Sequence, residues 1–135
     1  MRASTLAIRA AVLFAIAGIG MGIGMAMSQN HNLHAAHAHI NLVGWVSLFL
    51  FSMYYKTHAD VDAARLALAQ VWAWIAGGAL LSLGVTLIYS VGPQYEPFAA
   101  IGSLIVFGSL LLCAFIVFKP ATVASTPMPG AAPAE

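Results

Sequence analysis

Four histidines crowd into nine residues directly before an apolar run, at His31, His34, His37 and His39. A neutral imidazole is a good ligand for heme iron and for transition metals, and it also accepts and releases protons. Histidine is costly inside a bilayer, so an ionisable side chain that faces the interior of a membrane protein is a candidate for function. The stretch predicts heme binding, metal binding or proton transfer, with a solvated loop as the alternative.

The four histidines are not equivalent when the stretch is placed on a helix with 100° per residue. His37 then shares a sector with Asn41 and Gly44, whereas His39 points nearly the opposite way. We expect His37 to face the interior of the protein and His39 to face lipid headgroups or another subunit. Gly44, two turns below His37, would leave space for the edge of a porphyrin, and Asn41 could orient a ligand.

The composition predicts that these residues sit in an integral membrane protein. Apolar residues make up 61% of the chain and charged residues only 7%, whereas a soluble domain carries about 25% charged residues. Each apolar stretch is close to the ~20 residues that cross a bilayer as a helix. We predict an all-α, four-transmembrane-helix bundle in residues 1–119, with helices at 6–27, 37–55, 68–90 and 97–118.

The charges predict the orientation. The loops 28–36 and 91–96 hold no lysine or arginine, so the basic residues all fall on the other side, at Arg2, Arg9, Lys56, Arg65 and Lys119. The positive-inside rule makes that side cytoplasmic, with both termini inside and the histidines on the outer side of a bacterial inner membrane. A cleaved signal peptide is the alternative for the first segment. We expect residues 120–135, rich in proline and alanine, to be a disordered cytoplasmic tail.

Other features exclude partners or predict local packing. A net charge of +1 without a basic patch indicates no nucleic-acid partner. Gly18 and Gly22, four residues apart, predict a small face for close helix packing. The carboxylates Asp60 and Asp62 are expected at the start of the third helix. The aromatic residues at its two ends are expected at the membrane interfaces; they are Trp72, Trp74 and Tyr89.

Residues 37–56, "HAHINLVGWVSLFLFSMYYK", resemble the second transmembrane helix of the heme-copper oxidase catalytic subunit, with the nitric oxide reductase branch nearest. The resemblance covers about 20 residues strongly. It implies a cytochrome c oxidase subunit I-like protein that binds heme b and takes part in respiratory electron transport. His37 takes the position of the axial ligand of the low-spin heme, and Tyr54 and Tyr55 take the closing tyrosine pair. Secondary ligands and pocket residues are expected at His34, His39, Asn41, Gly44 and Trp45.

The chain also departs from that family. A complete catalytic subunit is similar to a twelve-helix bundle with six metal-ligand histidines, whereas this chain has five histidines in all. The ligands for a high-spin heme and for copper are absent, so oxygen reduction by this chain alone is not expected and enzyme activity stays open. A single heme b would need a second axial ligand. Three sources are open: His37 of a second protomer, the loop residues His31 and His34, or a methionine, Met21 or Met25.

Two other functions remain open. Met21 and Met25 are four residues apart near the same end of the first helix as the histidines. Thioether and imidazole ligands together favour copper, with methionine preferring Cu(I). A copper-handling protein with His34, His37 and these methionines is therefore one alternative. The other is a non-catalytic accessory subunit of a larger respiratory complex or a transporter, in which the histidines are solvated loop residues.

Overall fold

The computed structural model describes residues 1–118, so Lys119 and the predicted tail at 120–135 lie outside the described residues. The secondary structure of the described part is all helix, joined by short loops and without a strand. Within it four helices are long and apolar enough to cross a membrane: Ala3–Ser28, His34–Thr57, Arg65–Ser90 and Pro93–Phe118. The predicted all-α fold with four such helices is confirmed, and it is consistent with an integral membrane protein.

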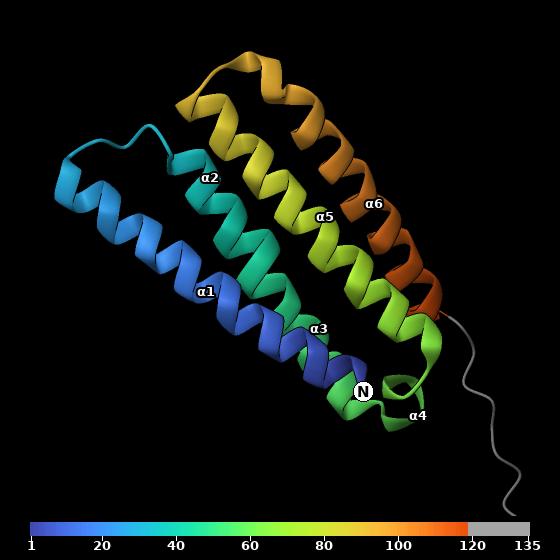
Figure 1. Ribbon diagram of the computed structural model, residues 1–135. Helices are drawn as coiled ribbons and strands as arrows, with labels where there is room; N and C mark the ends of the chain where they lie inside the picture. Colours follow the sequence, from blue (N-terminus) through green and yellow to red (C-terminus); the bar gives the residue numbers. More distant parts are fainter. Residues whose placement is uncertain (119–135) are drawn as a thin grey trace, which may run out of the picture.

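The spans follow one another in chain order as a row of neighbouring helices (Figure 1). The first is α1 (Ala3–Ser28), and the third is α5 (Arg65–Ser90), preceded by the short helix α4 (Ala59–Asp62). The second span joins α2 (His34–His39), the π-helix η1 (Ile40–Val46) and α3 (Ser47–Thr57). The fourth joins the 3-10 turn η2 (Pro93–Tyr95) to α6 (Glu96–Phe118). We call the end with loop 29–33 and η2 the histidine end, and the other the α4 end.

The π-helix explains which residues of the second span face the core. An α-helix turns about 400° in four residues, so buried positions spaced by four drift around it. A π-helix bonds each N–H five residues back and turns less per residue, as the Ser47 N–H does to the Leu42 carbonyl. Side chains spaced four residues apart therefore stay on one face of the helix. The buried residues it aligns are Ala36, Ile40, Gly44, Leu48 and Ser52.

Helix α6 packs chiefly against α5, on a surface of small residues. A methyl group on Gly102 would collide with the backbone of Leu81, and one on Gly84 would collide with the backbone of Ala99. Glycine therefore lets the two helices approach to backbone contact. Most remaining side chains of α6 are large, apolar and exposed. The described residues thus form a group of α1, α2–α3 and α5, with α6 attached to the far side of α5.

The larger core cluster lies toward the α4 end. It joins the start of α1 to α3 and α5 through side chains that include Leu48, Tyr55 and Val71. A smaller cluster of Ala36, Leu81 and Val85 lies toward the histidine end. Hydrogen bonds between buried polar side chains also lie toward the α4 end. The Tyr55 hydroxyl donates to Gln70 Oε1 at 2.9 Å, and Gln70 Nε2 donates to Ser109 Oγ at 3.2 Å, which links three spans.

The structure corrects the expectation for Asp62. This residue ends α4 rather than starting α5, and its buried carboxylate caps the first turn of α1 instead. Asp62 Oδ1 accepts the Ser4 backbone N–H at 2.7 Å, and Oδ2 accepts the Ser4 hydroxyl at 2.8 Å. The first N–H groups of a helix have no partner within the helix. Here one of them is satisfied by a carboxylate distant in sequence, while Asp60 is exposed on α4.

Trp74 is also placed differently from the expectation. Its side chain is 6% exposed, and its indole Nε1 donates to the carbonyl of Val43 at 2.8 Å. Val43 lies in the π-helix, so the bond connects that irregular segment to α5. Its neighbour Trp72 is exposed, as is Tyr89 at the other end of α5. These two positions agree with an interfacial role, whereas Trp74 belongs to the core.

Candidate functional site at the histidine end

His37 is held by the backbone of α1. Its Nδ1 lies 2.9 Å from the carbonyl oxygen of Gly18. A carbonyl only accepts hydrogen bonds, so Nδ1 carries the hydrogen in this contact, and the lone pair of a neutral ring is then on Nε2. Metal-ligating histidines commonly use the same device, in which a bond to one nitrogen fixes the ring and leaves the other as the ligand. A neutral His37 ring therefore presents Nε2, the nitrogen that could bind a metal.

Asn41 supports this arrangement one turn further along the helix. Its Nδ2 donates to the His37 carbonyl at 2.8 Å, and it lies 3.3 Å from His37 Nδ1. Both of those nitrogens are donors, so they do not bond to each other, and the amide hydrogen goes to the carbonyl. Asn41 therefore bonds the backbone of His37, and its amide is not free to bind a ligand through that hydrogen.

Two glycines of α1 pack directly against these side chains. A Cβ on Gly22 would lie 2.9 Å from His37 Cε1, and a Cβ on Gly18 would collide with the Asn41 amide. The small face predicted from the spacing of these glycines therefore accepts His37 and Asn41 rather than another helix backbone. His37 is half-buried, and its ring lies against α1.

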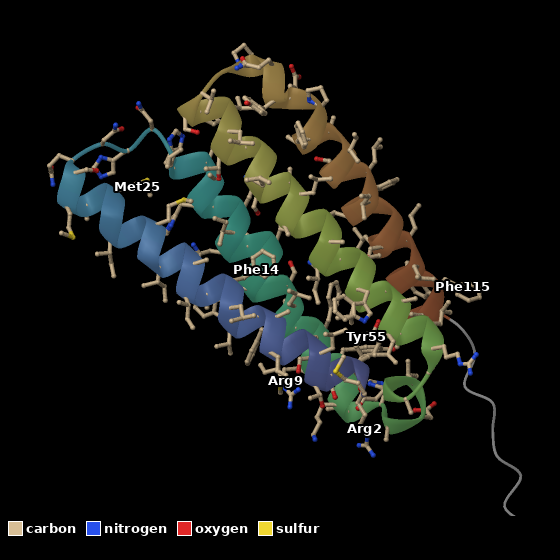
Figure 2. The ribbon with its side chains drawn as sticks, in the orientation of Figure 1. Arg2, Arg9, Phe14, Met25, Tyr55 and Phe115 are labelled. Carbon is tan, nitrogen blue, oxygen red and sulfur yellow. The ribbon has the colours of Figure 1, made fainter. Side chains whose placement is uncertain are left out.

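The space predicted beside Gly44 is filled. The ring of Phe14 from α1 lies directly against this glycine, so closely that a Cβ there would collide with it. Figure 2 shows Phe14 directed from α1 toward the second span. Trp45, expected to shape the same pocket, is exposed on the surface. The residues near Gly44 therefore do not fit a porphyrin edge, because an aromatic side chain takes that position.

Met21 and Met25 line one cavity at the histidine end, with a volume of about 460 Å³. Met25 is 9% exposed and Met21 is half-buried, and Figure 2 shows Met25 at this end of α1. The loop residues Asn30 and Asn32 and the side chain of Tyr89 complete the wall. The cavity combines two thioethers with amide groups, which suits a soft cation better than a hard one. His37 is not among its lining residues.

The remaining histidines lie elsewhere. His31 and His34 are exposed, and His34 Nδ1 contacts the His31 carbonyl at 3.0 Å. His39 is half-buried and lines a separate cleft with Glu96, between the second span and α5. It was expected at lipid headgroups or at another subunit. No three histidine, cysteine or carboxylate side chains of residues 1–118 gather in a metal-binding group.

Glu96 was not among the residues predicted for the site. The tight turn before it folds α6 back along α5, which brings Glu96 to the same end as the histidines. A sequence signal existed, because a short polar turn between two spans returns the chain to the same membrane face. The side of the second span that meets Glu96 carries Ala35 and His39, and it was not readable because it depends on how α2 packs against α5 and α6.

Comparison with known proteins adds no assignment. No protein-family model, no curated protein and no solved structure matches this chain.

Proposed function

We propose that the protein is a heme-b-binding integral membrane protein, similar to subunit I of the heme-copper oxidases, with His37 as an axial ligand. The observation that carries the proposal is the bond between His37 Nδ1 and the Gly18 carbonyl, which leaves Nε2 as the ligand atom. A heme held there would supply one-electron transfer, the chemistry of a respiratory electron carrier. The protein supplies the ligand, its orientation and its surroundings.

The filled space beside Gly44 restricts where a heme would bind. Phe14 closes that side, so a heme on His37 would approach from the histidine end. Met25 is buried on α1 within one turn of Gly22, on which the His37 ring rests. This supports a methionine as the second ligand over the exposed loop histidines. A second ligand from another protomer in a homo-oligomer, or from a larger respiratory complex, remains the other route.

The proposed setting is a bacterial inner membrane with the histidine end outside. Four basic residues lie in the half of the molecule nearer the α4 end: Arg2, Arg9, Lys56 and Arg65. The positive-inside rule then favours a cytoplasmic α4 end. In this orientation lipid surrounds the exposed apolar faces of α1 and α6, and the His37 site lies near the outer surface.

A reduced-minus-oxidised visible spectrum of the protein purified from heme-supplemented cells tests the proposal. We expect a b-type band that is lost in His37→Ala. His58→Ala is the matched control, because His58 is exposed at the α4 end, and it should keep the band. Wild-type protein without heme, or a band that His37→Ala leaves intact, would contradict the proposal.

A copper-binding protein is the second candidate, and the cavity of Met21 and Met25 is the observation that favours it. We expect the wild type to compete with a chromophoric chelator for Cu(I), because paired thioethers select that ion. The double variant Met21→Leu, Met25→Leu should lose this competition. Met27→Leu is the control, since Met27 is 82% exposed outside the cavity. Stoichiometric copper without heme would favour this candidate, and neither cofactor would favour the accessory-subunit alternative.

A further inference from the structure

A second cleft at the histidine end is separate from the His37 site and from the methionine cavity. It has a volume of about 300 Å³ and lies where α2, the end of α5 and the start of α6 meet. Its polar side chains are His39, Tyr89 and Glu96, and its apolar side chains include Val85 and Ile88. One wall is therefore apolar, while an imidazole and a carboxylate stand in the same small space.

The hydrogen bonding of His39 determines what this cleft can recognise. His39 Nδ1 lies 2.8 Å from the carbonyl oxygen of Ala35, so Nδ1 carries the hydrogen and Nε2 of the neutral ring is an acceptor. The carboxylate of Glu96 is also an acceptor. A ligand that satisfies both groups must donate two hydrogen bonds, and it must place an apolar body against Val85 and Ile88.

The surroundings select among such donors. A metal ion bound by protein side chains commonly takes three or four of them, and no metal-binding group of three occurs in residues 1–118. A flat, uncharged ring fits an apolar wall better than an ion does, because burying a charge is costly. The cleft also lies at the ends of the apolar spans, where a lipid-soluble molecule would place a polar head group.

We propose that this cleft binds the head group of a membrane quinol. One hydroxyl of the quinol donates to His39 Nε2 and another donates to the carboxylate of Glu96, while the ring packs on Val85 and Ile88. The inference goes beyond the proposed function, since it uses different residues and needs no heme. It assigns His39 to quinol binding rather than to iron.

The test is equilibrium binding to the full-length protein in lipid nanodiscs, measured by calorimetry under anaerobic, reducing conditions. The probes are tetramethylhydroquinone and its dimethyl ether, which keeps the ring and loses both donor hydrogens. We expect saturable binding of the quinol and binding of the ether weaker by roughly tenfold or more, the change that follows from losing donated hydrogen bonds. Equal affinity for the two probes, or no saturable quinol binding, would overturn the proposal.

Variants of the two acceptors localise the binding. His39→Phe and Glu96→Gln should each weaken quinol binding by roughly tenfold. His31→Phe and Asp60→Asn are the controls, because both side chains are exposed outside the cleft, and they should bind as the wild type does. Unchanged binding in variants that melt like the wild type would refute the site. If His39→Phe abolished a heme band instead, His39 would be a heme ligand, which separates failure of this inference from failure of the His37 proposal.

Discussion

The two ends of the molecule satisfy their polar groups in different ways. At the α4 end, buried side chains bond to one another or to the start of a helix, as Asp62 does with Ser4 and as Tyr55 does with Gln70. At the histidine end, His37 and His39 each use one ring nitrogen on a backbone carbonyl. Their second nitrogens have no protein partner among the described residues, and the His39 ring lines a cleft.

This difference indicates that the two ends of the molecule have different roles. Most of the buried core and the bonds between spans lie toward the α4 end, so that end stabilises the fold. The histidine end has a smaller core and half-buried imidazoles with one nitrogen available. Trp74 joins the two regions, because its indole binds the π-helix that follows the histidines. If the two ends differ in this way, substitutions at the α4 end should change stability and those at the histidine end should change ligand binding.

The largest effect on stability is expected for Asp62→Ala. It removes two hydrogen bonds to a carboxylate and leaves the first turn of α1 without its cap, so we expect a loss of roughly 3 kcal/mol in the free energy of unfolding. Thermal unfolding in detergent, followed by circular dichroism, measures the change. Asp60→Ala removes an exposed carboxylate two residues away, and it should unfold like the wild type. Equal effects of both variants would show that capping of α1 contributes nothing.

Trp74→Phe should come next. It keeps an aromatic ring against Phe51, whose ring centroid lies 4.7 Å from that of Trp74, but leaves the Val43 carbonyl without its donor. We expect a loss of about 1–2 kcal/mol and faster amide hydrogen exchange in residues 40–46. The matched control Trp72→Phe alters an exposed ring and should change neither quantity. Unaltered exchange in Trp74→Phe would mean that Trp74 does not hold the π-helix.

Two buried serines should respond differently to replacement by alanine. Ser109 Oγ accepts from Gln70 Nε2 and donates to the Gln70 carbonyl at 2.8 Å, so Ser109→Ala should lose about 1 kcal/mol of stability. Ser82 Oγ, nearer the histidine end, has no hydrogen-bond partner among the described residues. Ser82→Ala removes a buried polar group without breaking a bond, so its thermal midpoint should be unchanged or higher. A lower midpoint would show that Ser82 has a partner.

The smallest effect on stability, but a specific effect on the site, is expected for the α1 glycines. An alanine at Gly22 would displace the His37 ring, whereas a Cβ at Gly20 meets nothing within 4 Å. Gly20→Ala should stabilise α1 by roughly 0.5–1 kcal/mol through helix propensity. Gly22→Ala should gain less and should shift or abolish the proposed heme band. If both variants kept the same spectrum, His37 would not be the ligand.

Local patterns in the sequence predict much of the architecture. The apolar run lengths place the four long helices to within a few residues, because the requirement for about 20 apolar residues is local. The Gly18 and Gly22 spacing also predicts a closely packed face, which is present with a different occupant. The π-helix at Ile40–Val46 and its bond to Trp74 could not be read in this way, because the prediction assumed α-helical geometry through these residues. Asp62 was assigned to the nearest helix start, although the helix it caps lies far away in sequence.

The sequence by itself determined the class of fold and the supply of possible ligands, since apolar length and residue type are properties of the chain alone. Tertiary structure decided which ligands come together. Packing against α1 placed His37 on Gly18 and put Phe14 against Gly44, while the return of α6 brought Glu96 to the cleft of His39. The reason is geometric: these contacts join residues far apart in the sequence, and even the π-helix at Ile40–Val46 receives a bond from Trp74, on another span.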